Sequence, residues 1–87
     1  MRSYIKVHER ITVDISFPLK SKPIFHKFHW NNRDYLIKSL ELINKANKGE
    51  DLIYLFSIST LTGAYKLRFD VNQLSWWLEE IYWEEAR

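Results

Sequence analysis

The stretch from residue 53 to residue 71, IYLFSISTLTGAYKLRFDV, decides the fold that this sequence predicts. Side chains along a β-strand alternate between the two faces of a sheet, and a tight turn fixes which residues lie opposite one another. With the turn at Thr62-Gly63, one face is mostly apolar and pairs Thr60 with Tyr65, Ile58 with Leu67, Phe56 with Phe69 and Tyr54 with Val71. The other face pairs Ser59 with Lys66 and Ser57 with Arg68. The segment therefore predicts a hairpin with one apolar face and one basic, hydroxyl-bearing face.

A second hairpin is predicted around Asn31-Asn32, because asparagine tolerates the positive φ angles that two-residue turns require. This turn pairs Trp30 with Arg33, Phe28 with Tyr35 and His26 with Ile37 on one face, and His29 with Asp34 and Lys27 with Leu36 on the other. Both hairpins are antiparallel by construction.

The N-terminal segment alternates between apolar and polar residues from Ile5 to Phe17, and Glu9 is the only charge in the apolar series. A straight strand of this length would reach ~43 Å at ~3.3 Å per residue. A compact domain of this size is only roughly 31 Å across. We therefore expect the segment to bend, with a bulge or turn at Glu9.

The remaining segments are less strongly patterned. Pro18 and Pro23 enclose a predicted loop, and residues 39–44 suit either an extension of the strand or one helical turn. Residues 44–51 are polar and predict a loop that ends where the first hairpin begins.

The C-terminal segment, residues 74–83, has two interpretations. Leu74, Trp77, Leu78 and Ile81 fit a helical stripe, and Asp70 with Gln73 resembles a capping box. Glutamates at the helix C-terminus would oppose the helix dipole, and Trp, Ile and Tyr favour strands. We predict a strand, with a helix as the alternative. On a strand, Trp77 and Trp83 would lie on the face opposite to Trp76 and Tyr82.

Composition places the chain as one soluble domain over residues 1–87, with an all-β fold. We predict a small antiparallel barrel or a strongly bent sheet of five to six strands, since closure would protect the edges. The sequence has no cysteine, no apolar signal core and no apolar run near the ~20 residues that span a bilayer. These features predict a cytoplasmic protein with no membrane contact.

Several segments together resemble a known family. They are Pro23-x-x-x-x-Phe28-x-Trp30-x-x-Arg33-x-Tyr35-x-Ile37, Gly63-x-Tyr65-x-Leu67-x-x-Asp70, and Trp77-Leu78 with Ile81-Tyr82. The pattern resembles a small bacterial domain family of unknown function, often encoded near or fused to Y-family translesion DNA polymerases. The resemblance implies a strand at the C-terminus and a setting in DNA damage tolerance. It implies no activity.

No motif indicates catalysis or a cofactor. His26 and His29 are three residues apart, so on a strand they point to opposite faces and do not share a metal ion. His29 opposite Asp34 is predicted to be a cross-strand polar pair. Gly49 and Gly63 are too few for a phosphate-binding loop and instead suit a loop and a turn. We predict a protein that is not an enzyme, with no metal, cofactor or small-molecule substrate.

Charge and aromatic content suggest two kinds of partner. Residues 1–78 hold 12 Lys/Arg and 7 Asp/Glu, a net +5, whereas residues 79–87 hold four Glu and one Arg, a net −3. A basic sheet face predicts nucleic-acid binding through Arg10, Lys27, Lys38, Ser57, Ser59, Lys66 and Arg68. The C-terminal aromatics predict a protein interface formed by Trp76, Trp77, Tyr82 and Trp83.

An accessory interaction module is therefore the first functional hypothesis, with a protein partner or a homodimer formed through the C-terminal aromatics. The alternative is binding of single-stranded or duplex DNA through the basic face.

Overall fold

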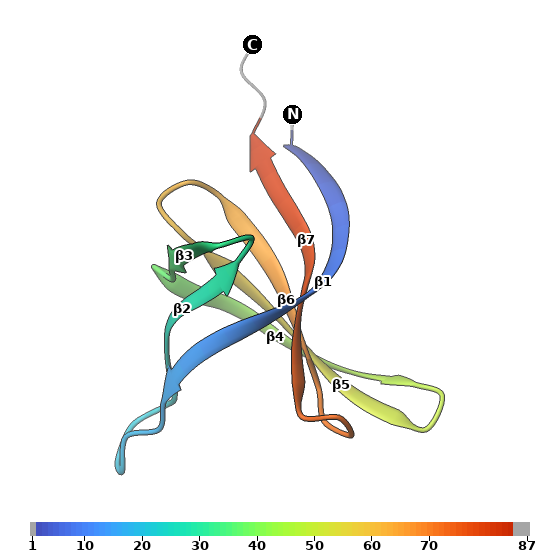
Figure 1. Cartoon of the computed structure of the whole chain (residues 1–87). Coiled ribbons are helices and arrows are strands. Elements are labelled where there is room, and N and C mark those ends of the chain that lie inside the picture. The colour runs from blue at the N-terminus through green and yellow to red at the C-terminus, as the bar shows by residue number, and fades with distance from the viewer. Residues whose placement is uncertain (1, 85–87) are drawn as a thin grey trace.

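The computed structural model describes residues 2–84 and folds them into one antiparallel sheet of seven strands (Figure 1). The strands are β1 (Arg2–Ser16), β2 (Ile24–Trp30), β3 (Arg33–Leu36), β4 (Ser39–Lys48), β5 (Asp51–Ser59), β6 (Ala64–Asp70) and β7 (Ser75–Glu84). Their order across the sheet is β3-β2-β1-β7-β6-β5-β4. The all-β prediction is confirmed. The predicted count of five to six strands is wrong, because the sheet has seven. Of the two predicted forms, a barrel or a bent sheet, the barrel is wrong because the sheet is not closed.

No helix occurs within residues 2–84, so this part of the chain has none long and apolar enough to cross a membrane.

The two edges of the sheet are consecutive in the chain. Strand β3 forms one edge and β4 the other, and only Ile37 and Lys38 separate them. The Ile37 amide donates to the His26 carbonyl at 2.8 Å, and the Lys38 amide donates to the Ser59 carbonyl at 2.7 Å. The chain takes three Cα–Cα steps from Leu36, the last residue of β3, to Ser39, the first of β4, and these steps span at most about 11 Å. The sheet must therefore curl until its two edges approach each other at this end.

The curl gives the sheet an inner and an outer face. The inner face carries the core, whose buried residues are Ile11, Phe28, Ile58, Tyr65, Leu67 and Leu78. Phe28 is completely buried, and its ring stacks on Tyr35 with centroids 4.9 Å apart. It also meets Tyr65 edge-on at 5.2 Å. The outer face carries Lys66 and Arg68, as the alternation along β6 requires.

The β5–β6 hairpin forms as predicted, but in a different register. Ile58 pairs with Tyr65 and Phe56 with Leu67, so each partner is displaced by two residues from the prediction. The reversal is centred on Leu61-Thr62, and the Thr60 amide donates to the Gly63 carbonyl. The Thr60 hydroxyl accepts the amides of Thr62 and Gly63, which stabilises the earlier turn. A shift of two keeps each side chain on its predicted face.

Gly63 has no positive φ in this turn; it suits the position because the backbone of Tyr82 lies close to it. A Cβ atom there would lie 3.2 Å from the Tyr82 carbonyl oxygen.

The β2–β3 hairpin has the predicted register. Four of the five predicted pairs form, and for the fifth, His26 with Ile37, the Ile37 amide donates to the His26 carbonyl. Trp30 lies opposite Arg33 and Phe28 opposite Tyr35, and the turn residues Asn31 and Asn32 have φ angles of 53° and 61°. The turn chemistry alone fixed this register, because only residues that tolerate positive φ fit a turn of this type.

Strand β1 bends where the sequence predicted it, next to Glu9. Lys6 pairs with Glu80 and Glu9 with Leu78, so Val7 and His8 together face the single residue between those partners. His8 has a φ of 52°, which marks the bulge. Beyond the bend, β1 leaves β7 and pairs with β2. Glu9 stays in the apolar series and accepts the Trp30 indole N–H at 3.0 Å.

The predicted polar loop over residues 44–51 is wrong. Strand β4 continues to Lys48, which pairs with Asp51 across a two-residue turn. Gly49 occupies this turn with a φ of 66°, a conformation that favours glycine. An exposed edge strand carries polar side chains just as a loop does, so the sequence pattern does not distinguish the two.

The C-terminal segment is the strand β7, and Glu79 is an extra residue in it opposite β6. This bulge reverses the alternation, so the predicted face assignment of the aromatics is wrong. Trp76 packs against the core, whereas Tyr82 lies with Lys66 on the outer face. Trp77 lies with Arg68 on that outer face too. By alternation from Ile81, Trp83 belongs to the inner face.

Candidate functional site

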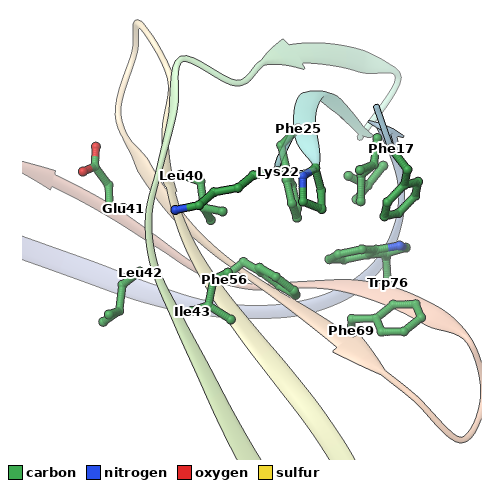
Figure 2. A pocket seen from close by; sticks show the side chains of 13 residues that line it. Phe17, Lys22, Phe25, Leu40, Glu41, Leu42, Ile43, Phe56, Phe69 and Trp76 are labelled. Carbon is green, nitrogen blue, oxygen red and sulfur yellow. The ribbon is translucent and has the colours of Figure 1, made fainter. Parts of the chain in front are cut away.

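An apolar groove of about 900 Å³ runs along the inner face of the sheet, in the half that the core does not fill (Figure 2). Its floor consists of four aromatic side chains that come from four strands: Phe25, Phe56, Phe69 and Trp76. Trp76 is the centre of this cluster, with ring centroids 4.8 Å from Phe69, 5.3 Å from Phe56 and 6.0 Å from Phe25. The groove therefore presents a preformed aromatic surface.

The walls of the groove are exposed aliphatic and aromatic residues. Leu40 and Ile43 line it from β4, and Phe17 lines it from the loop after β1 (Figure 2). Ile43 is 51% exposed and Phe17 is 76% exposed. Lys22 and Glu41 are the two charged side chains in the lining, and both are exposed. Large apolar side chains gathered in this way commonly mark an interaction surface.

A free sheet edge borders the same groove. Strand β4 is the last strand in the sheet order, so within residues 2–84 only one of its two sides is paired, with β5. Every second residue of such a strand directs its N–H and C=O groups away from the sheet. Apolar side chains and unpaired backbone groups thus lie next to each other.

The outer face carries a second cluster, in which cations cover two aromatic rings. Arg10 and Arg68 lie 5.3 and 6.0 Å from the centre of the Trp77 ring. The His8 ring stacks on Trp77 at 4.6 Å. Tyr82 is flanked in the same way by Arg2 at 5.2 Å and Lys66 at 5.7 Å. These rings are covered by the protein's own side chains, so they do not form an open stacking platform for bases.

Most of the predicted nucleic-acid-binding cations are paired with carboxylates. Lys66 contacts Glu80 at 3.2 Å, and Lys27 contacts Asp34 at 3.4 Å and Asp14 at 3.8 Å. Ser59 shares a 2.6 Å hydrogen bond with Ser39. The sheet brings Lys66, Arg68 and Arg10 together around Trp77 and Tyr82, whereas Lys27 lies apart on β2 and Lys38 joins the two edges. Ser57 lies opposite Lys66 instead of the predicted Arg68, because the hairpin register is shifted by two residues.

Arg68 is largely buried and holds two carboxylates in place. Its side chain is 15% exposed and contacts Glu79 at 3.4 Å and Asp70 at 3.5 Å. Asp70 is buried and also accepts the Gln73 amide, which fixes the turn before β7. Arg68 therefore has a structural role that its sequence pattern did not reveal.

Titratable groups on the outer face support one another. Burial alone would raise the pKa of Glu80, but hydrogen bonds from Tyr82 and Lys66 outweigh it and hold that pKa below its ordinary value. Burial and the hydrogen bond to Glu80 raise the pKa of Tyr82. Hydrogen bonds to Tyr82 and Glu80 raise the pKa of Lys66.

The predicted polar pair of His29 and Asp34 is confirmed. The His29 Nδ1 lies 2.7 Å from an Asp34 carboxylate oxygen, and hydrogen bonds from His29 and Lys27 lower the pKa of Asp34. His26 instead contacts the Ser16 hydroxyl at 2.6 Å.

Sequence reasoning placed Phe56 and Phe69 on an apolar face but did not find the groove. Phe25, Leu40 and Ile43 belong to segments whose partners could not be assigned from the sequence, and an additional residue at Glu41 interrupts the β4–β5 register. The one available signal was the density of large apolar residues outside the two hairpins.

No family model, curated protein or solved structure matches this chain. The resemblance to the polymerase-associated family therefore stays a prediction, and the functional argument depends on the contacts described above.

Replacing Arg68 tests its structural role. We expect Arg68→Met to lower the free energy of unfolding by about 1–3 kcal/mol, because Asp70 and Glu79 lose their cationic partner. Urea denaturation measures the change, and the exposed Lys38→Met is the matched control, with an expected effect within about 0.5 kcal/mol. Equal stability of the two variants would contradict a structural role for Arg68.

The outer-face network predicts a dependence of stability on alkaline pH. The pKa values of Tyr82 and Lys66 are raised in the folded protein, so their stabilising contribution is complete below the ordinary pKa values and is lost as the pH rises through the folded ones. Tyr82→Phe should destabilise the protein by about 1 kcal/mol at about pH 7. The difference from wild type should shrink above about pH 10.

Urea denaturation across this pH range measures that difference, and Tyr4→Phe on the exposed end of β1 is the control. A Tyr82→Phe difference that stays constant up to about pH 11 contradicts the network.

Proposed function

We propose that this protein is a non-enzymatic interaction module that binds an apolar segment of a partner protein in the inner-face groove. The observation that carries this proposal is the aromatic floor around Trp76, which is partly exposed and bordered by the exposed residues of β4. A partner would remove this apolar surface from water, which stabilises a complex by about 25 cal/mol for each Å² buried. The groove replaces the C-terminal aromatics as the proposed interface.

The four aromatics that the sequence singled out have different surroundings. Trp76 is part of the groove floor, whereas Trp77 and Tyr82 are covered by cations on the outer face. Trp83 is 39% exposed near the end of β7. A homodimer that buries all four at once is therefore disfavoured, because they do not share a surface.

A small-molecule ligand is a weaker interpretation of the groove. Its volume falls within the roughly 300–1,000 Å³ of such sites, but those sites also carry a few inward polar groups that orient the ligand. The charged lining residues here, Lys22 and Glu41, are both exposed. A protein segment needs no such groups, since the backbone of β4 can position it.

The partner itself is suggested only by the sequence resemblance. It points to a Y-family translesion polymerase as the first protein to test, in keeping with an accessory role in DNA damage tolerance.

A charge placed in the groove should weaken binding of a partner. We expect Ile43→Glu to weaken retention of a partner from native lysate, or of the polymerase, by at least about tenfold, since the carboxylate would be buried against apolar side chains. Leu74→Glu is the matched control, because Leu74 is also exposed but lies in the turn before β7. Equal retention by the wild type and both variants would exclude the groove as the interface.

We also propose, as a second candidate, weak binding of nucleic acid along β1. Arg2, Lys6 and Arg10 recur at every fourth position of the strand and are all exposed, so their charges are available to phosphates. The covered rings of Trp77 and Tyr82 disfavour stacking with bases, so this binding would depend on charge alone.

Oligonucleotide titration at two salt concentrations tests the second candidate. The double variant Lys6→Ala/Arg10→Ala should weaken binding at low salt, whereas Lys66→Ala should change it little because Lys66 already pairs with Glu80. Binding should fall steeply as salt is raised. An absence of binding at low salt, or binding that is insensitive to salt, contradicts the proposal.

A further inference from the structure

We infer that the occupant of the groove is an extended strand that pairs with the free edge of β4 and bridges the sheet towards β2. This inference depends on the proposed function, and it specifies how the partner is bound. The opening in the sheet has two sides. Strand β4 forms one of them, where its residues 40–43 line the groove, and its free edge continues to Lys48.

The other side of the opening is the first half of β2. Strand β3 pairs with β2 only from Lys27 to Trp30, although β2 begins at Ile24. The Ile37 amide adds one hydrogen bond to His26, so pairing on this side ends there within the described chain. Phe25 lies in the half of β2 that β3 does not pair with. It lines the groove, and its ring centroid is 5.1 Å from that of Phe56.

A strand in this position would pair with the free edge of β4 and also cover the aromatic floor. Its backbone would accept and donate hydrogen bonds to the outward groups of β4, and every second side chain would point at the aromatic floor. A helix could cover the floor but would leave the backbone groups of β4 unpaired. The joint presence of a free edge and an apolar groove therefore favours an extended partner with apolar residues at alternate positions.

A second copy of this chain fits the opening poorly. Its own β4 is the natural strand to offer, but that strand is already paired with β5 on one side. Paired with the first copy on its remaining side, it would extend the sheet outward and could not also reach β2. A segment that is not already part of a sheet has both sides free. We therefore assign the groove to a segment of a different protein.

Selection of displayed ten-residue random peptides on the full chain tests this inference. We expect enrichment of peptides with apolar residues at alternate positions, at least tenfold weaker binding to Ile43→Glu, and cross-strand nuclear Overhauser contacts between the peptide backbone and β4. Enrichment of none, or of peptides that Ile43→Glu binds equally well, overturns the inference together with the proposed function. Peptides that need Ile43 but show helical spacing or no backbone contact with β4 overturn the inference alone.

Proline substitution in β4 provides a matched pair of variants. The N–H groups of Asn44 and Lys45 point to opposite sides of the strand, one towards β5 and one towards the free edge. Proline at the outward position removes only a group available to the partner, and proline at the inward position removes a bond of the sheet. The variant that keeps wild-type stability should lose at least tenfold in affinity for the selected peptides. Unchanged affinity in that variant contradicts strand addition.

Discussion

The two-residue link between β3 and β4 is the constraint on which the rest of this structure depends. Because Ile37 and Lys38 join strands at opposite edges, the flat arrangement that seven strands could otherwise take is excluded. Each of the two residues donates its amide to the strand beside a different edge, Ile37 to β2 and Lys38 to β5. The chain connects the two edges at this point, although the edge strands do not pair and the sheet stays open.

This partial closure divides the inner face into two regions. Where the edges approach, Phe28 and Tyr35 fold over Tyr65 and Leu67, and the space fills with a packed core. On the rest of this face side chains do not fill the space, and Trp76 and its aromatic neighbours line an open groove. One sheet therefore supplies both the stability of the domain and an apolar surface, and neither requires an additional element.

The parts of the fold that follow from local chemistry could be predicted from the sequence. Asn31-Asn32 fixed the β2–β3 register, and the alternation over residues 53–71 assigned the faces of β5 and β6. The parts that depend on irregular backbone could not be predicted. Extra residues at His26, Glu41 and Glu79 each reverse the alternation, and no side-chain pattern distinguishes them in advance. The hairpin turn was also misplaced, because the Thr60 hydroxyl accepts the amides of Thr62 and Gly63 and stabilises a turn one residue earlier than predicted. The groove is formed by residues from strands that are far apart in the sequence, and the sequence alone does not show that these strands lie together.

Residue-resolved hydrogen exchange in the free protein tests most directly whether β4 is an open edge beside a groove. We predict a period of two along β4 after the extra residue Glu41, with amides that point to β5 protected and the intervening amides exchanging rapidly. Strand β6 should be protected at consecutive residues, because it has a neighbour on each side. Continuous protection along β4 would show that its edge is already paired in solution, and would contradict the account.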